Sequence, residues 1–313
     1  MPQLPQIHID QALTNVAIRY SNPEYVAERL SPIIPVGKRS GRFFVYGKEH
    51  LKVYETRRAP KSKAAEVDYT LSNSPFFAEE HALSELVTDA ESRYADPPIQ
   101  PEIDATERVT DSLKLGFEND VATKLTDPAQ VTQTTALSGT AQWSDYTNST
   151  PLTNIVTAKN AIRGSIIKPA NTLLVPYEVG LTLADHPSIK DLLKYTDPRS
   201  ITTSGLPPVV RGLQVVEALA MQNTANEGQA FTGGRVWGKN AVVLYVAPSI
   251  TGEKTVTTLV TFEAPDDTTG GRSWQTRRWR DEFRKGDMVE VARTYDLQFI
   301  AAGGAYLFTT AIA

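Results

Sequence analysis

The stretch that decides how this chain folds is residues 41–80, GRFFVYGKEHLKVYETRRAPKSKAAEVDYTLSNSPFFAEE. Aromatic residues stand at both ends of it, with Phe43 and Phe44 near the start and Phe76 and Phe77 near the close. The middle is polar and charged, and it has no apolar run long enough to build a core. We therefore expect an extended, hairpin-like arm that draws its stability from a neighbouring surface.

The arm is divided by charge. Residues 38–63 contain nine Lys or Arg and two acidic residues, a net charge of +7, whereas residues 66–91 contain seven acidic residues and no Lys or Arg, a net charge of −7. Such an arm can pair along its own length or with the arm of an identical neighbour. The residues that we expect to make intersubunit contacts are Arg57, Arg58, Lys61, Lys63, Glu66, Asp68, Glu79 and Glu80.

The composition limits the classes of function. The chain has 313 residues, 41% hydrophobic and 22% charged, which is ordinary for a globular protein of about two domains. Its net charge of −4 argues against a protein that coats nucleic acid. The absence of cysteine excludes disulfides, thiolate metal sites and Cys nucleophiles. With no apolar run of about 18 residues and no signal-peptide pattern, we expect a cytoplasmic protein without a membrane partner.

One long helix is predicted over residues 104–125. Asp104 fits the N-cap, and Glu107 fits the capping-box position that follows it. The residues that recur every four positions and mark one buried stripe are Val109, Leu113, Phe117, Val121 and Leu125. At roughly 33 Å, a helix of this length would act as a spine for the surrounding strands.

The rest of the chain predicts an α+β protein. The proline-bearing residues 1–40 form an N-terminal arm, with a short helix within residues 16–30 capped by Asn22. The further helices are expected at residues 151–167, 176–184 and 188–195. The further strands are expected at residues 171–175, 213–221, 241–246, 255–262, 288–295 and 298–310.

Two short motifs could carry chemistry, and each has a simpler interpretation. Residues 233–240, GGRVWGKN, nearly match a phosphate-binding loop, but Asn240 replaces the required Ser or Thr and a strand is expected to follow instead of a helix. We predict a hairpin turn there. Glu79, Glu80 and His81 offer three adjacent metal ligands, but neighbouring residues of a strand point to opposite faces. We expect no catalytic residue, no cofactor and no metal.

A second basic cluster lies near the C-terminus. Residues 272–285 contain six basic and two acidic residues and are interleaved with Trp274 and Trp279. The basic residues singled out are Arg272, Arg277, Arg278 and Arg280. They could bind nucleic-acid phosphates on the inside of an assembly, or make ion pairs between subunits with the tryptophans as buried anchors. We favour the ion pairs, because the acidic blocks of the same chain supply partners.

The order of these elements resembles the major capsid proteins of tailed bacteriophages of the Hong Kong 97 type. The resemblance spans nearly the whole chain and rests on an N-terminal arm, a long loop, a spine helix and then a mixed domain. The segments that carry it in that domain are NTLLVP at residues 171–176, ADHPSI at 184–189, VRGLQVV at 210–216 and KGDMVEV at 285–291.

The resemblance implies an L-shaped shell subunit that forms pentamers and hexamers of an icosahedral head around double-stranded DNA. The implied domains are an N-terminal arm at 1–40, an extended loop at 41–82, a peripheral domain at 83–127, an axial domain at 128–265 and a return to the peripheral domain at 266–313. The implied partners are a separate scaffolding protein, a portal, a decoration protein and the packaged DNA. The implied location is the virion capsid, and the host cytoplasm during assembly.

Two other functions remain open at this point. A cellular nanocompartment shell with the same fold would explain the same pattern of elements. An enzyme that uses a nucleotide or a metal would have to rely on residues 233–240 or on the Glu79–His81 segment. Some relatives cross-link their subunits through a loop Lys and a distant Asn. Lys61 and Lys63 lie in the loop, but no motif matches the partner, so no cross-link is predicted.

Overall fold

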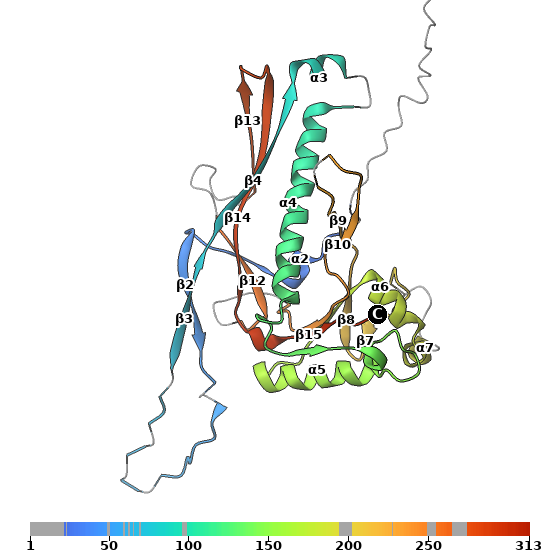
Figure 1. Ribbon diagram of the computed structural model, residues 1–313. Helices are drawn as coiled ribbons and strands as arrows, with labels where there is room; N and C mark the ends of the chain where they lie inside the picture. The colour runs from blue at the N-terminus through green and yellow to red at the C-terminus, as the bar shows by residue number, and fades with distance from the viewer. Residues whose placement is uncertain are drawn as a thin grey trace, which may run out of the picture.

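Two β-sheets and one long helix organise the part of the chain that the structure, a computed structural model, describes (Figure 1). The described residues are 22, 24–48, 51–58, 60–61, 63–64, 66–68, 70–95, 99–193, 202–226, 228–248, 255–264 and 274–313. Arg272 of the basic cluster and residues 16–21 of the expected N-terminal helix lie outside them. Among the described residues, no helix combines the length and apolar character needed to span a bilayer.

The predicted spine helix is present as α4 (Pro101–Thr126), which has 26 residues and is therefore about 39 Å long. Its start differs from the prediction. Gln100 is the N-cap, because Pro101 fits the first helical position, where no N–H is needed. Asp104 lies inside the first turn, and its carboxylate accepts the Gln100 N–H at 3.2 Å. The helix ends before Pro128, whose ring disfavours a helical Asp127.

The stripe predicted along the spine helix faces the core. Val109, Phe117 and Val121 are buried, and Leu113 is half-buried. Leu125, the last residue of the stripe, is buried, and so is the neighbouring Ala122. The stripe becomes continuous toward the C-terminal end of the helix, where both sheets approach it.

A five-stranded sheet lies alongside α4 and is built around β14 (Gly286–Phe299). This strand pairs with β13 (Trp274–Asp281) and β4 (Glu79–Thr88) along its first part, and with β12 (Leu259–Glu263) along its last five residues. β1 (Ile33–Pro35) adds to β12 in parallel. The sequence predicted a break in β14 near residue 296, and this is wrong, because β12 continues the ladder through residues 295–299.

A six-stranded sheet forms the second body. Its order is β5 (Thr134–Ala136), β15 (Ala305–Thr309), β11 (Ala241–Leu244), β6 (Thr172–Pro176), β8 (Leu213–Ala218) and β7 (Val209–Val210). The helices α5 (Pro151–Ile166), α6 (Tyr177–Asp185) and α7 (Pro187–Leu193) lie near it. All five residues of β6 are buried, as expected for a strand covered on both faces.

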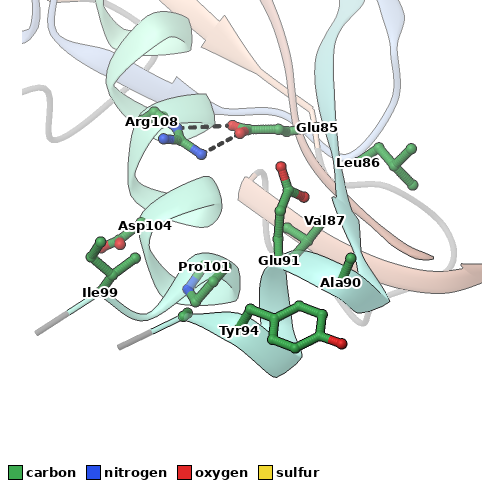
Figure 2. A pocket seen from close by; sticks show the side chains of 11 residues that line it. Glu85, Leu86, Val87, Ala90, Glu91, Tyr94, Ile99, Pro101, Asp104 and Arg108 are labelled. Atoms are coloured by element: carbon green, nitrogen blue, oxygen red, sulfur yellow. Dashed lines mark hydrogen bonds and ion pairs between the residues drawn. The ribbon is translucent and has the colours of Figure 1, made fainter. Parts of the chain in front are cut away.

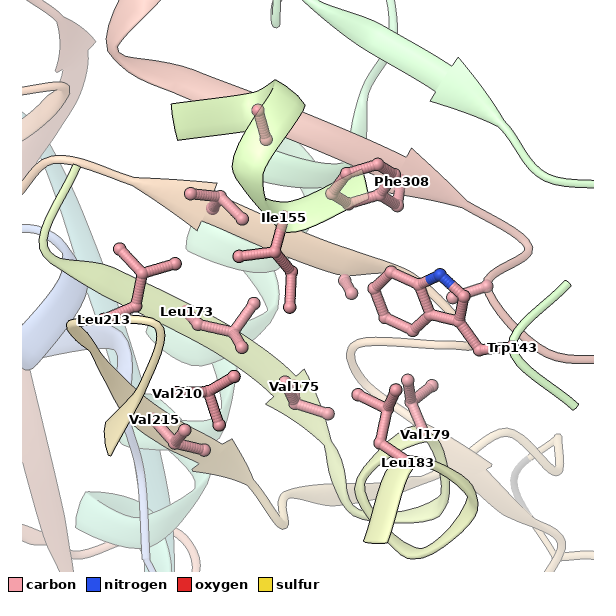
Figure 3. Close-up of a cluster of buried hydrophobic side chains, with 14 of the residues drawn as sticks. Trp143, Ile155, Leu173, Val175, Val179, Leu183, Val210, Leu213, Val215 and Phe308 are labelled. Carbon is pink, nitrogen blue, oxygen red and sulfur yellow. The ribbon is translucent and has the colours of Figure 1, made fainter. Parts of the chain in front are cut away.

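The two faces of the six-stranded sheet belong to different hydrophobic clusters. Leu173 and Val175 of β6 point into a cluster with Trp143, Ile155 of α5 and Phe308 of β15 (Figure 3). Leu174, on the opposite face, packs in a second cluster with the C-terminal end of α4 and with residues of the five-stranded sheet. The spine helix therefore joins the two sheets through one shared core.

The strands do not divide at the domain boundary expected at residue 265. β12 precedes the boundary but belongs to the five-stranded sheet, and β15 follows it but belongs to the six-stranded sheet. The reason is that the chain passes from β11 in the six-stranded sheet to β12 in the five-stranded one, and returns to the first sheet only at β15. Sequence order alone gives no sign of these crossings, because β12, β14 and β15 all show the apolar pattern of buried strands.

The arm is a two-stranded hairpin of β2 (Ser40–Tyr46) and β3 (Leu71–Phe77), and it projects from the body together with the long connection between the strands (Figure 1). Phe43 and Phe76 turn inward and contact Phe262 of β12, with ring centroids 5.4 and 4.5 Å apart. A side chain at Gly41 would come within 2.7 Å of the Phe76 ring. The base of the arm is thus fixed to the five-stranded sheet.

Two shorter elements differ from or extend the predictions. Within the described residues, the expected N-terminal helix is seen as α2 (Ala27–Leu30), whose N-cap is Val26 and not Asn22. The Asn22 amide instead exchanges two hydrogen bonds with the backbone of Met221, at 3.1 and 3.0 Å. After β4, the helix α3 (Asp89–Tyr94) starts in a capping box between Thr88 and Glu91. The strands β9 (Met221–Asn223) and β10 (Gly233–Arg235) form a small hairpin.

Candidate functional site

The arm exposes apolar side chains that the chain itself does not cover. Phe44 and Phe77, each next in sequence to one of the inward rings, are 56% and 61% exposed. In the connection between the strands, Val53 is 94% exposed and Val67 is 58% exposed. Apolar groups gathered in one projecting element are typical of a surface that another protein covers.

The charged residues predicted for intersubunit contact occupy two places. Six of them are exposed and lie in the connection between β2 and β3: Arg57, Arg58, Lys61, Lys63, Glu66 and Asp68. Glu79 and Glu80 lie on β4, beyond the hairpin, where Glu80 pairs with Arg39 at 3.3 Å. Lys63 pairs with Glu66. Within the β2–β3 ladder itself, no acid stands opposite a base.

The basic cluster makes its ion pairs within the chain. Arg278 on β13 binds Glu102 of α4 through both oxygens, at 2.6 and 2.8 Å, and also Asp287 at 2.6 Å. Arg280 binds Asp89 of α3 at 2.7 Å, and Arg277 lies 3.9 Å from Glu290. The Arg280 side chain lowers the pKa of the Asp89 carboxyl. These pairs connect β13 with α3 and the start of α4.

Asp89 belongs to the −7 block, so the structure brings part of that block onto the basic cluster of the same chain. Glu85 of the block likewise binds Arg108 of α4, at 3.2 Å from Nε. These ion pairs are exposed, and each stabilises the fold only slightly. Their consequence is geometric, because they fix the position of the β13–β14 end relative to α3 and α4.

The most deeply buried polar group on the spine helix is Glu118, which the sequence analysis did not single out. Its side chain is fully buried and accepts three N–H groups. One oxygen accepts the backbone N–H of Val26 and of Ala27, at 2.9 and 2.7 Å, and the other accepts the indole N–H of Trp237 at 2.6 Å. Glu118 therefore ties α2 and the segment before β11 to the spine helix.

Burial is the main influence on the Glu118 carboxyl and raises its pKa above the ordinary value of 4.5. The three N–H donors oppose this rise, because they favour the charged form. No pattern in the sequence reveals this role. Glutamate on a helix is expected to face water, and Glu118 lies one position beyond the apolar stripe at Phe117.

A second buried charge lies in the five-stranded sheet. Arg293 of β14 is 1% exposed and donates to Glu263 of β12 at 2.7 Å. Its guanidinium lies 4.3 Å from the Phe117 ring centre and 4.9 Å from that of Trp274. Cation–π contact of this kind helps to offset the loss of hydration. Next to it, the Tyr295 hydroxyl donates to Asp120 of α4 at 2.6 Å, and burial raises its pKa.

The two motifs considered for catalysis have other structural roles. Residues 233–235 form β10, and β11 follows where a phosphate loop would need a helix. A strand follows, as predicted, but β10 and β11 belong to different sheets, so the predicted hairpin turn is wrong. The segment between these strands places Trp237 against Glu118. His81 stacks on Tyr295 with ring centres 4.2 Å apart. Within the described residues, no group of three or more His, Cys, Asp or Glu is placed to hold a metal ion.

The chain resembles known proteins in both sequence and fold. No family model matches the chain. The major capsid protein of Pseudomonas phage JBD67 is 30% identical over 246 residues, which are 76% of this chain and 77% of that one. The major capsid protein of Burkholderia phage BcepMu is 28% identical over 243 residues, 76% of each chain.

Solved structures show the same fold. A phage-related protein from Bordetella bronchiseptica RB50 superposes with a TM-score of 0.68 at 22% identity, over 93% of both chains. The capsid of Cyanophage P-SCSP1u gives a TM-score of 0.63 at 12% identity, over 94% of this chain and 90% of that one. An encapsulin from Synechococcus elongatus gives 0.52 at 12% identity, over 94% and 91%.

The structure is an α+β shell-protein fold, with a projecting arm and a spine helix between two sheets. The chain belongs to the family of phage major capsid proteins, as its identity to the JBD67 protein over three quarters of both chains shows. The resemblance inferred from the order of elements is confirmed at this level.

Replacing Glu118 tests whether it holds α2 on the spine helix. The Glu118→Gln variant keeps the shape but turns an NH2 group toward at least one N–H donor, so we expect it to lower the free energy of unfolding by about 1–3 kcal/mol. Denaturant unfolding of the subunit measures this loss, and limited proteolysis should cut more readily near Ala27. The control Glu107→Gln, at an exposed position of the same helix, should change stability by less than about 0.5 kcal/mol.

The raised pKa of Glu118 also predicts a dependence on pH. The folded protein binds this proton more readily than the unfolded chain, whose pKa is 4.5. The carboxyl's contribution is thus fully present below pH 4.5 and is lost as the pH rises through the folded-state pKa. Urea unfolding over a pH series should show the wild type losing stability relative to Glu118→Gln as the pH rises from 4.5. The opposite slope would mean that the three donors outweigh burial.

Proposed function

We propose that this major capsid protein forms the shell of a tailed phage, assembling as pentamers and hexamers into an icosahedral head that encloses double-stranded DNA. The observation that carries the proposal is the arm, which projects from the body and leaves Phe44, Val53 and Phe77 exposed. An element that buries so little of itself gains stability only when a neighbour covers it. In a shell, the neighbouring copy is the available surface.

The parts of the subunit have separate roles in this proposal. Residues 41–82 are the extended loop that lies over a neighbour, with Arg57, Arg58, Lys61 and Lys63 meeting acidic groups there. The five-stranded sheet and α4 form the peripheral domain. The six-stranded sheet with α5, α6 and α7 forms the axial domain at the centre of each ring. The shared core around α4 supports this division, since it lets the two sheets act as one rigid plate.

We assign no catalytic role to the chain. Its further partners in this proposal are a separate scaffolding protein, a portal, a decoration protein and the packaged DNA. Arg277, Arg278 and Arg280 are engaged with acidic side chains of the same chain, which favours a structural role for them over direct binding of DNA. The protein would assemble in the host cytoplasm and reside in the virion capsid.

A nanocompartment shell is the second candidate. The likeness to an encapsulin supports it at the level of fold alone, because the identity is 12%. The phage proposal is favoured by the 30% identity to a phage major capsid protein. The contents of purified particles, DNA or an enclosed enzyme, would separate the two functions.

Assembly of the purified protein tests the proposal. Electron microscopy of the chain produced with the phage scaffolding protein should show rings and closed shells. Deleting residues 57–63 should leave a folded subunit that forms few shells, because the deletion removes the basic tip of the arm but none of the core. Circular dichroism and thermal unfolding check that the deleted subunit is folded.

The matched control is the double variant Arg57→Lys and Arg58→Lys, which keeps the charge of the arm and should assemble normally. A wild-type protein that stays monomeric under all assembly conditions would contradict the proposed function. If the deletion variant assembles as well as the wild type, the tip of the arm is not part of the interface.

Salt should weaken assembly if charge sets the register of the arm. Raising ionic strength from about 0.1 M to about 1 M shortens the screening length from about 10 Å to about 3 Å. We expect the shell yield, measured by sedimentation or light scattering, to fall over this range. A variant with Gln at positions 57, 58, 61 and 63 should assemble less at low salt and lose this dependence. If the shell yield of the wild type does not change with salt, the arm is held on its neighbour by Phe44, Val53 and Phe77 instead of by charge.

A further inference from the structure

The most exposed aromatic side chain among the described residues projects from the end of the molecule that lies away from the arm. Phe283 sits in the turn between β13 and β14 and is 102% exposed, more than any other large hydrophobic residue among those described. In Figure 1 this turn lies at the α3 end of the molecule, whereas the β2–β3 arm extends in the opposite direction. Full exposure of a phenylalanine is unfavourable in a lone subunit.

The turn that carries Phe283 is held by hydrogen bonds of its own. The Asp281 carboxylate accepts the backbone N–H groups of Phe283 and Arg284, each at 3.1 Å, and the Arg284 Nε–H at 2.7 Å. These donors lower the pKa of Asp281 and keep it charged. Because the turn is already fixed, little conformational entropy would be lost if Phe283 entered a partner surface.

The same end of the molecule holds a hollow of about 470 Å³ between β4, α3 and the start of α4. Its apolar wall is formed by Val87, Ala90, Tyr94, Ile99 and Pro101, whose side chains surround the opening in Figure 2. Tyr94 and Ile99 are 77% and 55% exposed. The hollow therefore offers open apolar surface with room for an aromatic ring.

The charged groups of the two surfaces are largely paired within the chain. In the hollow, Arg108 binds Glu85. On the β13–β14 hairpin, Arg278 binds Glu102 and Arg280 binds Asp89. These intrachain pairs hold both surfaces in fixed positions, so the contact between the surfaces would be mainly apolar.

We propose that Phe283 of one copy inserts into the hollow lined by Tyr94 and Ile99 of a second copy of this chain. The contact is heterologous, because it joins two different patches of the same surface, and such contacts close into rings when the rotation between copies allows it. This interface is additional to the arm and rests on the proposed function as a shell subunit. Phe283 would be its aromatic anchor, in the manner of interface hot spots.

The test uses the cysteine-free background of the chain. Glu282→Cys places a thiol beside the anchor, and Ala90→Cys places one on the wall of the hollow. The two singly substituted chains, one carrying a size tag, are assembled together and treated with a short bis-maleimide. We expect a cross-link between the tagged and untagged chains, seen on a denaturing gel.

The same cross-link should depend on the anchor. Adding Phe283→Ala should raise the subunit concentration needed for half-maximal assembly by at least about tenfold and remove the cross-link. The matched control is Phe231→Ala, which removes another exposed aromatic side chain, 71% exposed, from the loop between β9 and β10. It should change neither the assembly nor the cross-link.

The outcomes separate this interface from the proposed function. The interface is overturned if shells form but no cross-link joins positions 282 and 90. It is also overturned if the only cross-links join two chains that both carry the thiol at position 282. Either result leaves the shell function intact. Shells whose formation and cross-linking are unaffected by Phe283→Ala overturn the role of Phe283. A wild-type chain that forms neither rings nor shells overturns both proposals.

Discussion

The fold depends on one buried carboxylate that joins three segments distant in sequence. Glu118 accepts N–H groups from the first turn of α2 and from Trp237, which lies 119 residues further along the chain. Its donors at Val26 and Ala27 are N–H groups at the start of a helix, which have no partner inside that helix. One side chain thus satisfies a helix end and an indole inside the core. The N-terminal segment is thereby held on α4 at the point where the two sheets meet.

The same region contains Arg293, so the core around α4 is not purely apolar. Phe117 is adjacent to Glu118 in sequence, and its ring contacts the Arg293 guanidinium. Arg293 in turn reaches Glu263 on β12. Buried charges of this kind add little net stability, but each accepts only a narrow set of partners. They therefore favour one arrangement of α4, β12 and β14 over packings of similar hydrophobic burial, which suits a subunit that must be identical in every copy.

The sequence revealed features with a local signal and missed those that depend on distant partners. The spine helix was predicted because its apolar residues recur every four positions, and β11 because it is a short continuous apolar run. The continuity of β14 was missed because it depends on pairing with β12, and the role of Glu118 was missed because its donors come from other parts of the chain. The ion pair of Arg280 with Asp89 joins residues 191 positions apart. The exposed arm was predictable, since a polar stretch between aromatic ends cannot bury itself.

The rigid middle and the exposed ends of the subunit follow from a single requirement. Each subunit of a shell is held by neighbours at more than one surface. Bending of the subunit between two of these contact surfaces therefore weakens the assembly. Here the arm is fixed at its base by Phe43 and Phe76 against Phe262, and the opposite end is fixed by the Arg278 and Arg280 pairs to Glu102 and Asp89. Between them lie the longest helix and the longest strand that the structure describes, α4 and β14. Large apolar side chains are exposed at the two ends, whereas the middle holds the hydrophobic core that the two sheets share with α4. Exposed apolar ends on a well-packed body are consistent with a chain whose lowest free energy is reached only among copies of itself.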